Sequence, residues 1–564
     1  MPGWARTGVA TAAVIGVGLW ARLIHIYNFF VYPDSYYYLL LADNLRNSGR
    51  LYGRLGPSGM RFPPIGAAIF KPVYPALVAL VDFALNNPGR SGHVVGIGAS
   101  AGSIFLVYLL GTRLFGSRLT GLISALLLAV SFNHIFFSGF IMGDTVSLFL
   151  LLAVLLLALR QDQTAYGNSL DFAAGASFAL LFLSRATYVV IMPGLLWLMA
   201  LEYGWQKERW LTALSSGCAV LALTTVLILP PLGQLAPVVK EAAPIVLSAL
   251  ALVALSGLGF LAARRRGLNL EANPGKRLAD IAFFLLLAAP ILAQAANFIM
   301  AAGAGKVFYP GLQRFVANDP LISALGIAGL LWLYRSPGRR LSVFFALSTF
   351  LLLVVYYQVA GWEGRYLIQA LPFLIIPGAW AVMIVSAALF DHLNVGAGLA
   401  RTGAVFALAA LLLVFGLTLK RALTPASGVL LKPSYEAQVS RLARPALARY
   451  SKDTVLIAAL PWGYYYHLRF STWGLDARQP GKVLRFLPKQ GSFLVVMDAP
   501  LRLQFPAVAK RLAALKNAGQ ATSFQIAQGY SSGQLSIAGK HEVIIYELGY
   551  EQLANALQPK RALP

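Results

Sequence analysis

Two aspartates stand where an apolar segment meets a more polar one. Asp34 directly follows the first apolar run, within residues 33–38 (PDSYYY), and a helical pattern comes after it. Asp144 lies at the mouth of another apolar run, where an acidic side chain is costly to place. A carboxylate at such a position can act as a general base towards a hydroxyl group. The alternative for both is capping, because an aspartate at a helix start accepts a backbone N–H.

Several cations accompany these acids. Arg185 interrupts an apolar stretch, and Arg365 opens another. Arginine makes bidentate, permanently charged contacts with phosphate, so both are candidate phosphate ligands. Snorkelling is the alternative for both, as is an ion pair of Arg365 with Glu363. Lys71 closes the loop that Asp34 opens. Further candidate phosphate ligands, for which contact with lipid head groups is the alternative, are Arg61 and Arg314.

Other polar residues are weaker candidates. Tyr465 and His467, within residues 462–469 (WGYYYHLR), are predicted to bind an acceptor, although a buried face or an interfacial belt explains such aromatics equally well. We expect His134 to anchor the membrane interface or to pack beside an aromatic ring. A divalent metal is compatible with Asp34 and Asp144 but is not required, because no spacing of histidines and carboxylates commits the chain to one.

The elements that must position these residues are membrane spans. Of the 564 residues, 58% are hydrophobic and 12% are charged, whereas an average soluble domain has roughly 25% charged residues. Repeated uncharged runs, the first over residues 8–30 and without a cleavage site after it, predict a polytopic α-helical membrane protein with about thirteen spans. The net charge of +25 is scattered among loops, which argues against a nucleic-acid partner. The single cysteine, Cys218, excludes an intrachain disulfide.

The distribution of Lys and Arg predicts the orientation. Alternate turns collect most of the positive charge, so we expect a cytoplasmic N-terminus and, with an odd number of spans, an extracytoplasmic C-terminus. The first outer loop, residues 34–75, breaks this rule with five basic residues, and phosphate binding would explain the exception. We predict a transmembrane domain over residues 1–420 that includes this loop. Residues 421–564 are predicted to form a small extracytoplasmic α/β domain, with strands near 454–460, 492–497 and 542–546 and helices near 435–450 and 505–518.

The first outer loop also carries a resemblance. The string PDSYYY at residues 33–38 and the string KPVYPAL at residues 71–77 resemble the first outer loop of GT-C superfamily glycosyltransferases. The most similar branch is protein O-mannosyltransferase-like and includes the aminoarabinose lipid A transferases. The motif order, span number, topology and C-terminal domain extend the resemblance over essentially the whole chain. The Trp-Trp-Asp-Tyr-Gly signature of oligosaccharyltransferases is absent, which disfavours that branch.

The resemblance implies a GT-C fold and a multi-pass enzyme of the plasma (inner) membrane. It would move a sugar, with inversion, from a polyprenyl-phosphate donor to a lipid, glycan or protein acceptor. By the same resemblance, Asp34 is the general base, Asp144 is a second active-site carboxylate, and Lys71 lies near the lipid phosphate. The alternative is a transporter or flippase for an anionic lipid, against which the absence of an inverted repeat argues. A third alternative is that the protein is a structural scaffold that only presents its C-terminal domain. This alternative would leave the motif in the first outer loop unexplained.

Overall fold

The computed structural model describes the chain in segments. These are residues 3–26, 33–49, 53–55, 60–62, 71–159, 167–185, 188, 191, 195, 198, 212–213, 215–221, 315–335, 339–360, 364–392, 435–451, 454–459, 464, 468, 470–475, 480–530 and 541–558. The chain divides into two compact units. The helical unit consists of Met1–Tyr27 and Gly66–Thr424, and the sheet unit consists of Asn28–Ile65 and Pro425–Pro564.

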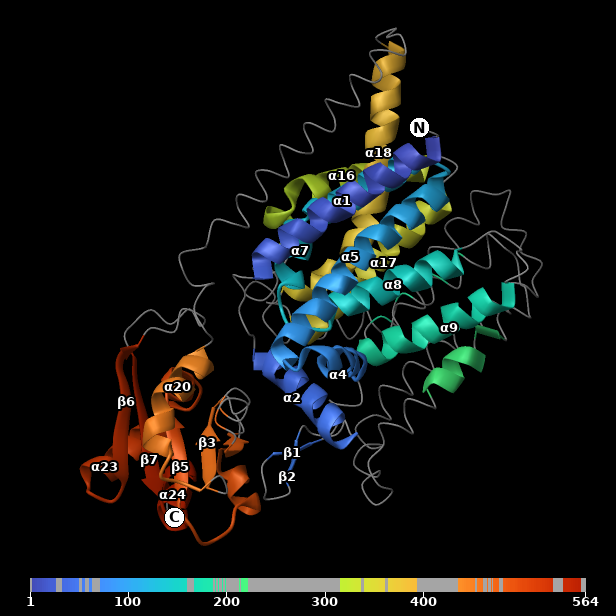
Figure 1. Cartoon of the computed structure of the whole chain (residues 1–564). Coiled ribbons are helices and arrows are strands. Elements are labelled where there is room, and N and C mark those ends of the chain that lie inside the picture. The colour runs from blue at the N-terminus through green and yellow to red at the C-terminus, as the bar shows by residue number, and fades with distance from the viewer. Residues whose placement is uncertain are drawn as a thin grey trace, which may run out of the picture. The chain divides into compact units, whose positions relative to one another are not determined.

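The helical unit is built from the apolar runs of the sequence (Figure 1). Its described helices are α1 (Gly3–Ile26), α4 (Val73–Leu85), α5 (Pro88–Phe115), α6 (Arg118–Val130), α7 (Phe132–Ser138), α8 (Asp144–Ala158), α9 (Gly167–Ser184), α16 (Pro320–Arg335), α17 (Arg339–Ala360), η3 (Gly364–Ala370) and α18 (Leu371–His392). Side-chain caps fix where several of them start. Asn87 accepts from the backbone N–H of Arg90 at the start of α5, and Ser117 accepts from Thr120 at the start of α6.

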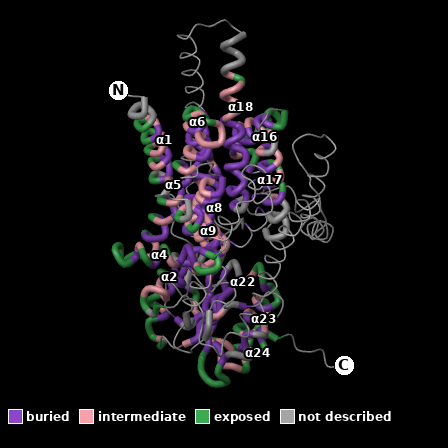
Figure 2. Tube along the Cα trace, turned by 90° about the vertical axis from the view of Figure 1, so that its right-hand side faces the viewer, coloured by how far each residue is buried: buried purple, intermediate pink, exposed green. Residues whose placement is uncertain are grey.

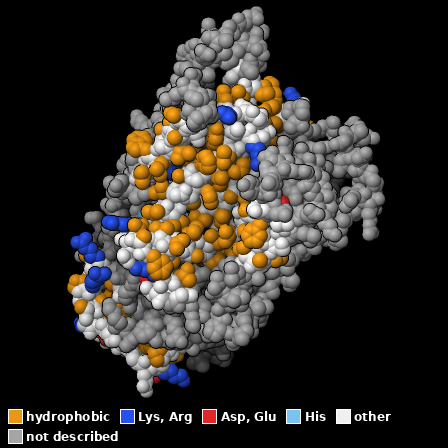
Figure 3. Space-filling model, turned by 45° about the vertical axis from the view of Figure 1, so that its right-hand side comes forward, with side chains coloured by type: hydrophobic (Ala, Val, Ile, Leu, Met, Phe, Trp, Pro, Cys, Tyr) orange, Lys and Arg blue, Asp and Glu red, His pale blue; other side chains and the backbone are white. Residues whose placement is uncertain are grey.

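These helices are buried on their inner sides and apolar on their outer sides. Figure 2 shows buried positions running along α8 and α18. On the outside, Leu80 and Phe83 of α4 are 66% and 64% exposed, and Leu331 of α16 is 65% exposed. Hydrophobic side chains cover much of the face drawn in Figure 3. An extensive apolar surface of this kind suits contact with lipid rather than water.

Small residues let pairs of helices approach closely, as is typical of helices in membranes. A Cβ atom on Gly329 of α16 would lie 2.1 Å from the carbonyl oxygen of Pro377 in α18. A Cβ atom on Gly121 of α6 would lie 2.5 Å from the carbonyl oxygen of Tyr108 in α5. Both contacts are with backbone atoms, which cannot swing aside. We conclude that a side chain at either glycine would push the helices apart.

Only part of the predicted set of spans falls on described residues. Among these, two helical segments are long and apolar enough to cross a membrane, namely Pro88–Phe115 and Leu367–Ser386. The bent pair α6 and α7 makes a third if it counts as one span. Shorter apolar helices include Gly8–Leu23 and Asp144–Ala158. Five of the expected spans, over residues 188–200, 211–229, 243–262, 281–300 and 405–419, lie largely or wholly outside the described residues, so the number of about thirteen stays a prediction.

The sheet unit contains a five-stranded sheet of order β4-β3-β5-β7-β6. β3 runs parallel to both β4 and β5, whereas β7 runs antiparallel to β5 and β6. The strands and helices are β3 (Val455–Ala458), β4 (Ser471–Gly474), β5 (Phe493–Met497), β6 (Thr522–Tyr530), β7 (His541–Leu548), α20 (Tyr435–Leu447), η5 (Pro480–Phe486), α22 (Ala499–Gln504), α23 (Pro506–Asn517) and α24 (Tyr550–Leu557). β3, β5 and β7 lie where the sequence predicted strands, and α20 and α23 lie where it predicted helices.

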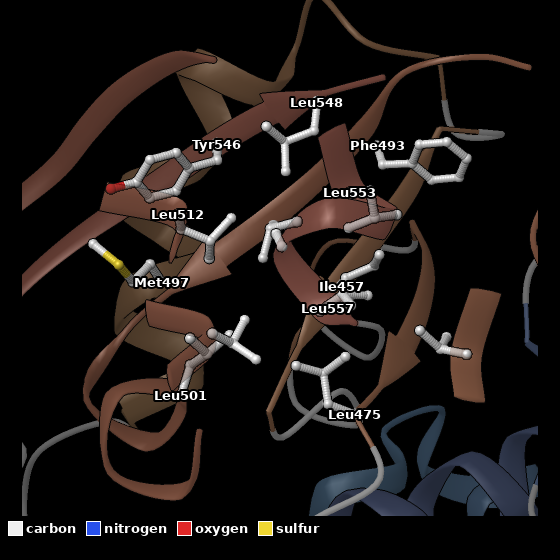
Figure 4. Packing of buried hydrophobic residues seen from close by; sticks show 14 of the residues in the cluster. Ile457, Leu475, Phe493, Met497, Leu501, Leu512, Tyr546, Leu548, Leu553 and Leu557 are labelled. Atoms are coloured by element: carbon white, nitrogen blue, oxygen red, sulfur yellow. The ribbon is translucent and has the colours of Figure 1, made fainter. Parts of the chain in front are cut away.

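Both faces of this sheet are covered. Val455 and Ile457 of β3 belong to one hydrophobic core, part of which is drawn in Figure 4, while Leu456 and Ala458 belong to a second. Alternate residues of a strand point to opposite faces, so each face has its own core. Two-sided burial explains why β3 and β5 are continuous apolar runs. The extracytoplasmic placement of this unit stays a prediction.

Residues 34–65 of the first outer loop group with the sheet unit, and residues 66–75 group with the helical unit. The described elements of the first part are α2 (Pro33–Ser48) and a hairpin of β1 (Gly53–Leu55) and β2 (Met60–Phe62). The unit boundary between Thr424 and Pro425 lies close to the predicted one at residue 420. Residues 28–65, however, group apart from the helical unit, whereas the sequence analysis assigned residues 34–75 to the transmembrane domain.

Candidate active site

Asp144 joins separate segments of the helical unit. It is the first residue of α8, follows the N-cap residue Gly143 and is 1% exposed. Its Oδ1 atom forms an ion pair with Nη2 of Arg185 and accepts a long hydrogen bond, of 3.4 Å, from Nε2 of Gln369. The carboxylate therefore binds Arg185, which directly follows α9, and Gln369 of η3. Capping of its own helix, the alternative drawn from position alone, does not describe these contacts.

The second carboxylate oxygen of Asp144 differs from the first. Oδ2 is buried and has no hydrogen-bond partner among the described residues. Buried polar atoms are normally hydrogen-bonded, because an unpaired one has lost its hydration without compensation. Oδ2 therefore has the capacity to accept a hydrogen bond from a hydroxyl group or to take up a proton.

Arg185 lies at the end of α9. Its backbone N–H donates to the carbonyl of Leu181 at 2.8 Å, so it continues the last turn, where a cation faces the negative end of the helix. Next to it, the hydroxyl groups of Ser184 and Ser147 are 2.6 Å apart and join α9 to α8. Tyr188, one turn further on, is buried and lies within electrostatic range of Arg185 and Asp144.

Arg365 approaches the same cluster from η3. It is buried, and its Nη1 atom donates to the sulfur of Met142 at 3.0 Å. Met142 lies two residues before Asp144, and Gln369 lies four residues after Arg365 on η3. Glu363, the alternative partner of Arg365, lies outside the described residues. The structure thus brings together three residues singled out from the sequence, Asp144, Arg185 and Arg365, in a buried group with two guanidinium groups and one carboxylate.

The remaining candidates are placed less completely. Asp34 is the second residue of α2 and Arg61 lies in β2, but the side chains of both are outside the described residues. Lys71 is half-buried just before α4. The candidates Arg314, Tyr465 and His467 lie outside the described residues. Where the structure is described, no group of three His, Cys, Asp or Glu side chains is arranged to hold a metal ion.

Sequence analysis missed a second buried carboxylate, that of Asp319. Its Oδ1 accepts from the backbone N–H of Phe132 at 2.8 Å, and its Oδ2 accepts from the backbone N–H of Asn133 at 3.1 Å. The Ser131 hydroxyl and the Asn133 amide also donate to Oδ2, at 2.8 and 2.7 Å. Asp319 directly precedes Pro320, the first residue of α16, and this Asp-Pro start was the available signal.

The burial of His134 does not fit the predicted interfacial anchor, and packing beside an aromatic ring stays a prediction. The ring is fully buried, and its Nδ1 atom lies 2.6 Å from Nη2 of Arg22, a residue of α1 that sequence analysis did not single out. Arginine can only donate, so His134 accepts at Nδ1 and is neutral. The adjacent run of phenylalanines suggested an interfacial or aromatic environment, but the nearest polar group is an arginine 112 residues away in the chain.

Comparison with known proteins gives a family-model match to part of the chain and a shared fold. Residues 70–231 match the family model of dolichyl-phosphate-mannose-protein mannosyltransferases. The match spans Lys71, Asp144 and Arg185. No curated protein matches the chain in sequence.

Several solved structures share the fold. ArnT from Cupriavidus metallidurans, bound to undecaprenyl phosphate, is 14% identical with a TM-score of 0.56, and 99% of each chain is covered. The archaeal oligosaccharyltransferase AglB from Archaeoglobus fulgidus, in complex with an inhibitory peptide and a dolichol-phosphate, is 15% identical with a TM-score of 0.53, covering 93% of this chain and 74% of that one. The arabinofuranosyltransferase AftD from Mycobacteria is 15% identical with a TM-score of 0.51, covering 96% and 40%.

Proposed function

From the GT-C glycosyltransferase fold of this chain, we propose that it is an integral membrane enzyme that transfers a sugar from a polyprenyl-phosphate donor to an extracytoplasmic acceptor. The GT-C resemblance predicted from the sequence is confirmed by the family-model match and by the shared fold. Undecaprenyl phosphate in one similar structure and dolichol-phosphate in another support a lipid phosphate as the carrier. A lipid, a glycan or a protein is the acceptor.

The observation that carries this proposal is the buried group around Asp144. This group contains two arginines and only one carboxylate, so it suits an anionic ligand such as a phosphate. The Oδ2 atom of Asp144, for which the described segments supply no hydrogen-bond partner, suits a hydroxyl group. Glycosyl transfer from a lipid phosphate needs both functions, because charge accumulates on the departing phosphate while an acceptor hydroxyl loses its proton.

The proposed reaction is a single displacement with inversion. The acceptor oxygen forms a bond to the anomeric carbon, and the bond from that carbon to the phosphate oxygen breaks. The electron pair of the broken bond leaves with the lipid phosphate, and the acceptor proton passes to a carboxylate. Arg185 and Arg365 would stabilise the phosphate, and Asp144 would orient the acceptor.

The other roles rest on sequence and resemblance. We assign Asp34 as the general base and Lys71 as a phosphate ligand at the end of the first loop. Arg61 and Arg314 would add positive charge for the phosphate, and Tyr465 and His467 would contact the acceptor. The reaction requires no cofactor. We further propose that the protein resides in the plasma membrane, with its N-terminus in the cytoplasm and its C-terminal segment outside.

The proposal is tested by reconstituting the purified full-length protein with a panel of radiolabelled polyprenyl-phosphate sugars and a membrane extract as acceptor. Wild-type protein should transfer label, and Asp34→Asn should not, although it still binds the lipid. The matched control is Asp43→Asn on the same helix, where the Asp43 carboxylate accepts a local hydrogen bond from Asn47 at 3.0 Å. Binding of the donor lipid without transfer by any variant, wild type included, would favour the flippase alternative.

A further inference from the structure

α6 and α7 form a broken helix. α6 ends at Val130, α7 begins at Phe132, and the two are bent by 57°. Such a break leaves carbonyl groups at the end of the first helix and N–H groups at the start of the second without partners inside the helix. Water cannot satisfy these groups in a membrane interior, so the protein must supply partners.

Arg22 of α1 supplies partners to the end of α6. Its Nη1 donates to the carbonyl of Ala129 at 3.2 Å, and its Nη2 donates to the carbonyl of Leu128 at 3.3 Å. The other acceptors of this guanidinium are the carbonyl of Gly18, Nδ1 of His134 and Oγ of Ser100. All five N–H groups of Arg22 therefore have an acceptor, and its charge faces the negative end of α6.

Asp319 does the same for the start of α7. Its two carboxylate oxygens accept from the backbone N–H groups of Phe132 and Asn133. The hydroxyl of Ser131, which itself accepts from the N–H of His134 at 3.3 Å, donates to Oδ2 of Asp319. Among the described residues, neither Arg22 nor Asp319 forms an ion pair. Each buried charge is thus matched to one side of the same helix break.

The break leads directly into the candidate active site. Residues 139–143 connect α7 to α8 and end at Asp144. This connection carries Met142, whose sulfur accepts from Arg365. A change in the direction of α7 would therefore displace Met142 in the connection and Asp144 at the start of α8, which contact the buried arginines.

We propose that Arg22 and Asp319 are positioning residues that clamp the α6–α7 break and so hold Asp144 and Met142 against Arg185 and Arg365. The expected effect on catalysis rests on the proposed function. The clamp itself does not, because it can be measured without substrate.

The direct test is cysteine accessibility in purified full-length protein. In a Cys218→Ser background, Ile135→Cys reports on α7, where Ile135 is 0% exposed, and Ala381→Cys reports on α18, where Ala381 is 4% exposed. Arg22→Met and Asp319→Asn should each raise maleimide labelling at position 135 by at least about tenfold, the change expected when hydrogen bonds to a charged group are lost from an opening equilibrium. Labelling at position 381 should not change.

Arg118→Met is the matched control. Arg118 is exposed at the opposite end of α6, so its substitution removes one arginine charge, as Arg22→Met does, without touching the break. It should leave labelling at position 135 unchanged. An unchanged rate at position 135 in both clamp variants would overturn the proposal, and so would equal rises at positions 135 and 381, which would mean general loosening.

A kinetic measurement links the clamp to the site. Arg22→Met and Asp319→Asn should lower kcat for sugar transfer by about 100-fold, as expected from a small misplacement of reacting groups. The KM for the donor should change much less. If labelling rises while kcat stays at the wild-type value, positioning of the site is overturned. If wild-type protein transfers no sugar, the proposed function fails while the labelling result still tests the clamp.

Discussion

Asp498 in the sheet unit and Asp144 in the helical unit are both buried, and they use their carboxylate oxygens differently. Oδ1 of Asp498 accepts from the backbone N–H of Leu501 at 2.9 Å, which caps α22, and its Oδ2 accepts from the Tyr464 hydroxyl at 2.7 Å. Asp144 binds Arg185 and Gln369 through one oxygen, and its other oxygen has no partner in the described part of the chain. Burial by itself therefore does not distinguish a structural carboxylate from a candidate catalytic one. The two carboxylates differ in their contacts, because Asp144 pairs with an arginine whereas Asp498 caps a helix and binds a tyrosine.

The largest expected effect comes from breaking the ion pair of Asp144. Arg185→Met leaves a buried carboxylate without its cation and should destabilise the full-length protein by about 3–5 kcal/mol. Thermal unfolding of the purified protein measures this loss. Arg185→Met combined with Asp144→Asn should recover a large part of it, because the unpaired charge is gone. Equal unfolding temperatures for the single and double variants would show that the two residues are not coupled.

The sheet unit should respond to pH through Asp498. Burial raises the pKa of this carboxyl from 3.8 to about 6, because the charged form loses its hydration. The folded state therefore holds the proton more tightly than the unfolded state does. Stability falls as the pH rises from about 4 to about 6, by about 3 kcal/mol, and this contribution is constant above that window.

Hydrogen exchange of β5 in the full-length protein, corrected for intrinsic rates, measures this pH dependence, because Asp498 directly follows the strand. Asp498→Asn is the control and should flatten the profile. A wild-type profile as flat as that of Asp498→Asn would contradict the assignment.

We expect the smallest effect from a substitution that removes one hydrogen bond to Asp498 and so makes its carboxylate resemble that of Asp144. Tyr464→Phe removes the hydroxyl that donates to Oδ2 of Asp498 and leaves a buried carboxylate oxygen unpaired. We expect a loss of about 1–2 kcal/mol in the sheet unit, the usual penalty for an unsatisfied buried polar group. Faster exchange of β5 amides would report it. If exchange rates match those of the wild type, the hydroxyl is not needed to satisfy the carboxylate.

The two units also differ in how far their elements could be predicted from sequence. β3 and β5 were found because a strand buried on both faces is a continuous apolar run. β4 and β6 were missed, since Ser471–Gly474 is short and Thr522–Tyr530 mixes polar and apolar residues. In the helical unit the apolar runs predicted helices. The break between α6 and α7 was not predicted, because its stabilising groups come from α1 and from the residue before α16.

For the candidate site, charged residues inside apolar stretches gave a signal in the sequence, and neutral residues gave none. Asp144, Arg185 and Arg365 stand out because a charge inside an apolar stretch needs a reason. Gln369 and Met142 carry no charge and gave no such signal. Arg22 was not singled out, because it lies within the first predicted span. Asp319 acts on a helix start 186 residues earlier in the chain, a contact that only the tertiary structure brings about.

The most direct test of the central claim is the rate of sugar transfer by Asp144→Asn. This nearly isosteric change removes the charge and replaces an accepting oxygen by a donating amide. The kcat is measured with reconstituted full-length protein at saturating donor and acceptor. We predict a value at least about 100-fold below that of the wild type, with binding of the lipid phosphate retained. A variant that transfers sugar at the wild-type rate would contradict the account.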